Sequence, residues 1–126
     1  MLFRSEFIHT RKTAALIRAS LEMGAIAAGA GDDALGLVGG FGSRIGLAFQ
    51  VVDDILDIVS TDEVLGKDVG SDEDKDKATY PKVFGLERSK EIARGLVNEG
   101  KSFLEGIDRD TEALRGLADF VVSRVY

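Results

Sequence analysis

The fold of this chain is decided by its longest apolar stretch, which reads ALGLVGGFGSRIGLAFQVVDDILDIV from Ala34 to Val59. Large apolar side chains recur there at the three- and four-residue spacing of an α-helix, and they leave no clean polar face. A helix that is apolar on all sides must be buried among neighbours. Its glycines each lower helix propensity by about 1 kcal/mol relative to alanine, so we expect them at close contacts between helices. The stretch predicts a buried helix over Ala34–Val59.

Helices are also expected on both sides of this segment. One Ala-, Leu- and Ile-rich helix is predicted over Lys12–Ala30, with Lys12 at its N-terminal end and a stop at residues 31–33 (GDD). Thr79 and Pro81 supply a capping residue and an early-turn proline, so helix is expected to resume there. Between the central helix and the helix that resumes at Thr79, residues 61–79 are polar and rich in Gly, Asp and Lys, which predicts a long loop.

Two amphipathic helices complete the pattern. The first follows a break at Gly85, and its apolar stripe is formed by Ile92, Ala93, Leu96, Val97, Phe103, Leu104 and Ile107. The second is capped by Asp110, and its stripe is formed by Leu114, Leu117, Ala118, Val121 and Val125. The two-residue alternation that is typical of strands is absent from the sequence, which therefore predicts an all-α fold.

Composition limits the possible functions. A length of 126 residues with 44% hydrophobic residues predicts one folded domain. The formal net charge of −6 argues against binding to nucleic acid or anionic lipid by bulk electrostatics. The sequence has no cysteine, which excludes disulfides and thiolate metal sites and fits a cytoplasmic location. No membrane span is expected, because Arg44 and the acids from Asp53 onward interrupt the most apolar stretch.

Three acids within the central helix are the strongest chemical feature. Asp53 and Asp57 lie one turn apart on the same face, with Asp54 about 100° away around the helix. Carboxylates among Val, Ile and Leu repel one another and are costly to desolvate, so a cation is expected beside them. The cation that suits them is Mg²⁺, which takes a few carboxylates, several waters and a substrate phosphate. The alternative is an ordinary solvated acidic face.

Lysines offer a complementary set of groups for phosphate. Lys67 and Lys77 lie in the polar loop, and Lys12 precedes Thr13 at the start of an apolar helix. An ammonium group binds phosphate as a point charge with three donors. The alternative for each of them is a solvent-facing lysine, since charged side chains are mostly exposed.

The helices are too apolar for the number of partners within the chain. Two helices that are apolar on nearly every face have only two or three amphipathic helices to pack against. The chain is therefore expected either to oligomerise extensively or to belong to a larger helical fold.

Four segments, taken together and in this order, resemble the C-terminal half of the trans-isoprenyl diphosphate synthases, the polyprenyl synthetase family that includes farnesyl and geranylgeranyl diphosphate synthases. They are HTRKT at 9–13, FQVVDDILD at 49–57, GK at 66–67 and KATYP at 77–81. The likeness covers residues 1–126, so the whole chain is expected to be the C-terminal half of a single domain.

The resemblance implies an all-α fold in which two aspartate-rich motifs face each other across a cavity and hold Mg²⁺ on an allylic diphosphate. Asp53, Asp54 and Asp57 match the second motif. The match implies that Lys12, Lys67 and Lys77 bind the diphosphate, whereas Thr13 and Gln50 line the cavity near the reacting carbons. The implied reaction condenses the allylic diphosphate with isopentenyl diphosphate, and the implied assembly is a homodimer.

The first aspartate-rich motif, the isopentenyl diphosphate pocket and the residues that set product length lie upstream of any residue present. The chain by itself is therefore expected to be an inactive fragment of a synthase. Two alternatives remain, a non-catalytic regulatory subunit of a heteromeric synthase and a terpene-cyclase-like relative.

Overall fold

The computed structural model describes the backbone of residues 2–65 and 79–126 and the side chains of residues 12–60 and 79–126. Its helices, in chain order, are α1 (Leu2–Ala27), α2 (Asp32–Leu65), α4 (Tyr80–Phe84), α5 (Leu86–Leu104) and α6 (Glu112–Ser123). No strand occurs within these residues, so the prediction of an all-α fold is confirmed.

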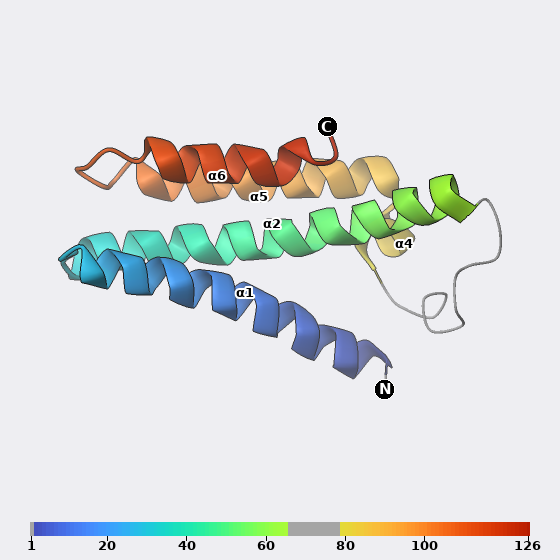
Figure 1. Ribbon diagram of the computed structural model, residues 1–126, viewed down its shortest axis with the longest axis horizontal. Helices are drawn as coiled ribbons and strands as arrows, with labels where there is room; N and C mark the ends of the chain where they lie inside the picture. The colour runs from blue at the N-terminus through green and yellow to red at the C-terminus, as the bar shows by residue number, and fades with distance from the viewer. Residues whose placement is uncertain (1, 66–78) are drawn as a thin grey trace.

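Helix α2 is the centre of the bundle. Figure 1 shows it between α1 on one side and the α5–α6 pair on the other, with α4 beside its C-terminal part. Toward its N-terminal end, α1 diverges from α2. The α1–α2 and α5–α6 connections therefore lie at one end of the bundle, and the C-terminal part of α2 lies at the other, beside α4.

The core lies where α2 meets α5 and α6. The most deeply buried apolar residues come mainly from α2, with smaller contributions from the other two helices: Phe41, Ile45, Ala48, Val51, Val52, Ile55, Ala93, Val97, Leu104, Ala118 and Val121. The central helix predicted from the apolar stretch is thus confirmed. One stripe position was wrong, since Leu117 is 42% exposed. It directly precedes the fully buried Ala118 in α6.

The first two helices have different ends from those predicted. Helix α1 begins at Leu2, so Lys12 lies in its interior and has no helix N-terminus to help it bind an anion. The chain turns after Ala27 through Gly29, whose φ of +86° suits glycine. Asp32 and Asp33 then occupy the first turn of α2, where carboxylates interact favourably with the helix dipole, and do not end α1.

The C-terminal part of α2 also runs further than expected. The helix continues to Leu65, so residues 61–65 are helical and do not belong to the predicted loop. The remainder of that loop, residues 66–78, lies outside the described residues. The next helix begins as predicted, because the Thr79 hydroxyl accepts a hydrogen bond from the backbone N–H of Lys82 at 3.4 Å. The predicted break is also confirmed, since Gly85 has a φ of +85°.

The residue that caps the last helix lies one position later than predicted. The Asp110 carboxylate accepts a hydrogen bond from the backbone N–H of Glu112 at 2.9 Å, as expected of a capping side chain. Thr111 is the residue that directly precedes the helix.

Two glycines of α2 allow α1 to approach closely. A Cβ atom on Gly46 would lie 2.9 Å from the Cα atom of Ala14, and one on Gly42 would lie 3.0 Å from the Cα atom of Arg18. Both contacts involve backbone atoms, which cannot move aside as a flexible side chain can. Glycine at these positions therefore sets the distance between the two helices, as the sequence predicted.

Gly46→Ala is accordingly expected to lower the free energy of unfolding by about 1–3 kcal/mol, the usual cost of overpacking. Gly36→Ala is the matched control on the same helix, because no atom outside its own helix lies within 4 Å of the added Cβ. It should stabilise the protein by about 0.5–1 kcal/mol through helix propensity alone. Denaturant unfolding of both variants tests the prediction, and equal effects would show that the helix contact is unimportant.

Helix α1 has an apolar surface that no other described helix covers. Leu16, Met23 and Ile26 are 67%, 69% and 58% exposed. Their spacing places them on one side of the helix. The sequence-based expectation that α1 lacks partners is therefore observed for the described side chains.

The segment Asp32–Ser60 is long and apolar enough to cross a membrane, with a mean hydropathy of 1.4. Half of its most apolar window is buried within the bundle, and the core helix of a soluble protein meets the same criterion. The absence of a membrane span therefore stays a prediction.

Candidate active site

The three predicted carboxylates lie on the C-terminal half of α2. Asp53 and Asp54 are half-buried, whereas Asp57 is exposed. The neighbouring Val52 and Ile55 are fully buried in the core. Because the same helical turns carry core and acidic residues, packing of the core fixes the backbone from which the carboxylates project.

Asp53 contacts the C-terminal segment of the chain. An Oδ1–Nη2 distance of 3.4 Å joins it to Arg124, which directly follows α6. The Arg124 guanidinium also lies over the ring of Phe49, 5.3 Å from its centroid. The side chains of Arg124 and Asp53 are 30% and 40% exposed, so their ion pair stabilises the fold by at most about 1 kcal/mol.

Tyr80, the first residue of α4, lies near Asp54. Burial raises the pKa of the Tyr80 phenol above its ordinary value, and the negative charge of Asp54 raises it further. The Tyr80 ring also packs against that of Phe84, with 5.9 Å between centroids. At neutral pH the phenol thus stays protonated, and it can donate a hydrogen bond. It lies beside the acidic segment of α2, which is formed by Asp53, Asp54 and Asp57.

Three further predicted residues lie on α1 and α2. Gln50 is half-buried and lies within one turn of Asp53. Because α1 and α2 are antiparallel and cross at Ala14 and Gly46, the residues just before Ala14 lie beside those just after Gly46. Thr13, which is half-buried, directly precedes Ala14 at this crossing, whereas Lys12 is exposed and lies about 160° around α1 from Ala14, on the side away from α2.

Lys67 and Lys77 lie outside the described residues. Of the predicted site residues, the described structure thus carries Gln50 and the three aspartates on one stretch of α2, with Thr13 beside the point where α1 crosses that helix. The contribution of the two loop lysines stays a prediction.

The donor set fits Mg²⁺ only when other ligands complete it. Among residues 12–60 and 79–126, no three His, Cys, Asp or Glu side chains come together as a ready-made metal cage. This is expected of acids that project from a single helix, because Asp54 points about 100° away from Asp53 around the helix axis. Mg²⁺ tolerates such a site, because it binds one or two carboxylates and fills its octahedron with waters and substrate phosphate oxygens.

Sequence reasoning assigned no site role to Arg124, Phe49 or Tyr80. Arg124 and Asp53 are 71 positions apart, and no local spacing connects them. Phe49 and Tyr80 do stand within the quoted motifs, but nothing in those motifs indicates which charged group each of them meets.

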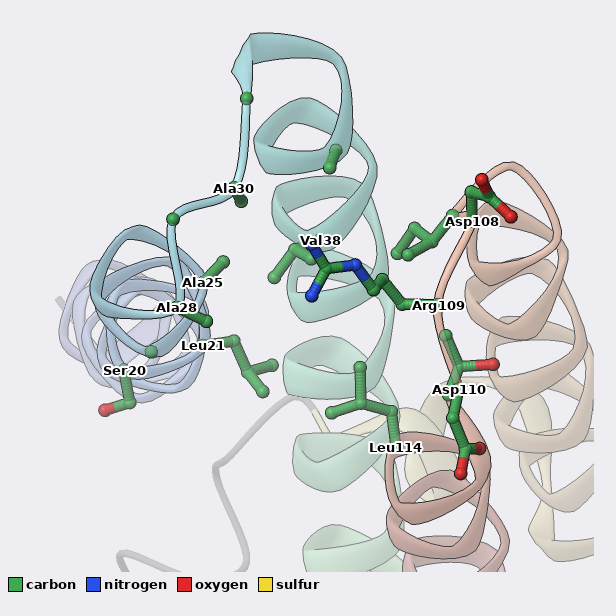
Figure 2. A pocket seen from close by; sticks show the side chains of 16 residues that line it. Ser20, Leu21, Ala25, Ala28, Ala30, Val38, Asp108, Arg109, Asp110 and Leu114 are labelled. Carbon is green, nitrogen blue, oxygen red and sulfur yellow. The ribbon is translucent and has the colours of Figure 1, made fainter.

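A cavity of about 550 Å³ lies at the opposite end of the bundle, between the α1–α2 and α5–α6 connections. Leu21, Val38, Ile107 and Leu114 contribute apolar side chains to its lining. Figure 2 shows Arg109 extending from the α5–α6 connection toward Val38. At 1.5 Å per helical residue, the acids of α2 lie about 20 Å further along that helix, so this cavity is separate from the acidic segment.

Comparison with known proteins supplies the family. The family model described as polyprenyl synthetase matches residues 4–109. The chain belongs to the polyprenyl synthetase family. Its fold agrees, since a crystal structure described as a putative farnesyl-diphosphate synthase from Marinomonas sp. MED121 superposes with a TM-score of 0.71 at 32% identity, covering 93% of this chain and 38% of that one.

Two curated relatives illustrate the similarity. The heterodimeric geranylgeranyl pyrophosphate synthase large subunit 1 of Arabidopsis thaliana is 48% identical over 94% of this chain and 32% of its own length. The farnesyl diphosphate synthase of Escherichia coli is 44% identical over 94% of this chain and 41% of its own length. This polyprenyl synthetase chain thus spans roughly a third to two-fifths of the relatives that it matches.

Proposed function

We propose that the protein containing this chain is a trans-prenyltransferase that condenses an allylic diphosphate with isopentenyl diphosphate. The observation that carries the proposal is the acidic segment with Asp53, Asp54 and Asp57 on the core helix of a polyprenyl synthetase domain. The names of the relatives, which are farnesyl and geranylgeranyl diphosphate synthases, support the same substrate class.

In this proposal the acidic side chains bind the metal, and the basic side chains bind the diphosphate. Mg²⁺ held by Asp53, Asp54 and Asp57 would supply positive charge to the departing diphosphate. The ammonium groups of Lys12, Lys67 and Lys77 bind oxygens of the same diphosphate. Positive charge that is already in place when the carbon–oxygen bond breaks stabilises the developing negative charge without reorganisation.

Thr13 and Gln50 have a different role in the proposal. Gln50 lies within one turn of Asp53 on α2, and Thr13 directly precedes Ala14, where α1 crosses that helix. There they orient the allylic end of the substrate, so that the double bond of isopentenyl diphosphate can attack the carbocation. An otherwise apolar surrounding keeps water from that cation.

We also propose that residues 1–126 are the C-terminal half of one domain, whose N-terminal half carries the first aspartate-rich motif. The exposed Leu16, Met23 and Ile26 support this division, because a partner surface is needed to cover them. The short span of the chain relative to its relatives also supports it. Alone, the chain is then inactive. A homodimer and a cytoplasmic location stay predictions.

Product analysis of the complete protein tests this function. Supplied with an allylic diphosphate, radiolabelled isopentenyl diphosphate and Mg²⁺, it is expected to form a longer prenyl diphosphate, and chelation of the metal should abolish product. Hydrocarbon formed without isopentenyl diphosphate would instead indicate a terpene-cyclase-like enzyme. Turnover only after addition of a second synthase subunit would indicate a regulatory subunit.

Lys67→Gln and Lys77→Gln are each expected to weaken binding of the allylic diphosphate by about 10-fold or more, since a hydrogen bond to a charged group is lost. Binding of the corresponding prenyl alcohol should hardly change, because the alcohol lacks the phosphates. Calorimetric titration with both ligands provides the measurement.

Lys101→Gln is the matched control for these variants. It removes the same charge from α5, where Lys101 pairs with Asp119 at 2.5 Å. It should bind both ligands normally. Equal weakening for diphosphate and alcohol in the Lys67 or Lys77 variants would show a general loop defect and contradict the phosphate contact.

A further inference from the structure

The C-terminal segment of the chain is attached to the bundle at two points. Arg124 contacts Asp53 and Phe49 of α2, at 3.4 Å from the carboxylate and 5.3 Å from the ring centroid. Two residues later, the Tyr126 ring lies against α5, with the Arg94 guanidinium 4.1 Å from its centroid and the Lys90 ammonium at 5.9 Å. The residues that follow α6 therefore contact both α2 and α5.

The electrostatics of the acidic segment explain why a cation lies there. Asp53 is adjacent to Asp54 and one turn from Asp57, and like charges at this spacing destabilise a helix. The Arg124 guanidinium is a cationic group that also lies over the Phe49 ring, 5.3 Å from its centroid. It thus offers Asp53 a positive charge when no metal is present.

We propose that Arg124 is a positioning residue that holds Asp53 in the metal-free protein and gives up this contact when a divalent cation binds. The inference rests on the proposed function, in which Asp53 is a metal ligand. Arg124 and the metal then compete for the same carboxylate, so their binding to it is coupled. The coupling is reciprocal. The contact between Arg124 and Asp53 lowers the affinity for the metal by a certain factor, and metal binding weakens that contact by the same factor.

The competition predicts an unusual pair of effects for Arg124→Met. The variant should melt at a lower temperature than the parent in metal-free buffer, because Asp53 loses its ion pair with Arg124. It should also bind Mn²⁺, a probe for the Mg²⁺ site, about two- to fivefold more tightly, the range expected when a half-exposed ion pair no longer competes. Saturating Mn²⁺ should narrow the difference in melting temperature.

A purely structural role predicts a different result. If Arg124 only tied α6 to α2, its loss would lower the melting temperature equally with and without metal, and Mn²⁺ affinity would not change. Arg124→Lys separates charge from shape, because it keeps a positive charge but loses the planar group over Phe49. It should bind Mn²⁺ with an affinity between those of the parent and Arg124→Met.

The experiment measures free Mn²⁺ by electron paramagnetic resonance during titration of the complete protein and its variants. Arg115→Met is the charge control, since Arg115 also lies on α6 but bonds to Thr111 at 3.2 Å and not to an aspartate of α2. Asp53→Asn tests the metal assignment itself, and it should weaken Mn²⁺ binding.

Tighter Mn²⁺ binding by Arg124→Met, with Arg115→Met unchanged, supports the inference. Equal or weaker binding by Arg124→Met, or the same tightening in Arg115→Met, overturns it and leaves the proposed function intact when Asp53→Asn still loses affinity. Unchanged binding by Asp53→Asn overturns both the metal assignment and the inference.

Discussion

Asp53→Asn in the complete protein is expected to lower kcat by about 100- to 1000-fold, the range seen when one preorganised electrostatic contact to a transition state is removed. The substitution keeps the shape of the side chain but removes the charge that a metal ligand needs. Stability should change little, because the side chain is 40% exposed and its observed ion pair is a weak one. Steady-state kinetics gives kcat, and thermal melting of the same preparation gives the stability.

Asp119→Asn is the matched control for this variant. Asp119 is also a helical aspartate with a cationic partner, Lys101, but it lies on α6 and its side chain is 61% exposed. It should keep near-parental turnover. If Asp53→Asn also turned over normally at saturating Mg²⁺, Asp53 would not be a metal ligand in the reaction.

The isolated 126-residue chain is expected to show no detectable condensation of prenyl diphosphates. One aspartate-rich segment supplies only part of a metal cluster, and a site with one wall missing cannot exclude water. The exposed apolar side of α1 should also make the chain associate. Light scattering measures the association, and incorporation of radiolabelled isopentenyl diphosphate measures the activity.

Met23→Lys separates these two defects. Met23 is 69% exposed, so a charge at this position should reduce association without disturbing the core. It should not restore activity, which is expected to return only when the N-terminal half of a synthase is supplied. A monomeric chain that turned over substrate by itself would require a complete site within residues 1–126.

The buried centre of the fold was predictable because its signal is local and dense. Apolar residues along Ala34–Val59 recur at helical spacing, and Phe41, Ile45 and Ile55 are indeed almost fully buried. Helix ends were harder to predict. Residues 2–11 mix charged and apolar side chains, so their helix was missed, and Asp32 and Asp33 were assigned to the end of one helix although they begin the next.

In the candidate site, too, some relations between residues were predictable from the sequence and others were not. The three aspartates and Gln50 share one helix, so their relation follows from sequence spacing. Arg124 reaches Asp53 only because α6 folds back against α2, and Ala14 meets α2 only because Gly46 lets α1 approach. Contacts of this kind depend on how helices pack, which no local pattern in the sequence contains.

The acidic segment of α2 is proposed to bind diphosphate through a divalent metal. The most direct test is calorimetric titration of the complete protein with inorganic pyrophosphate, with and without Mg²⁺, beside the Asp53→Asn variant. Binding is expected to require Mg²⁺ and to be at least about 10-fold weaker in the variant. Equal affinity with and without Mg²⁺, unaffected by Asp53→Asn, would contradict it.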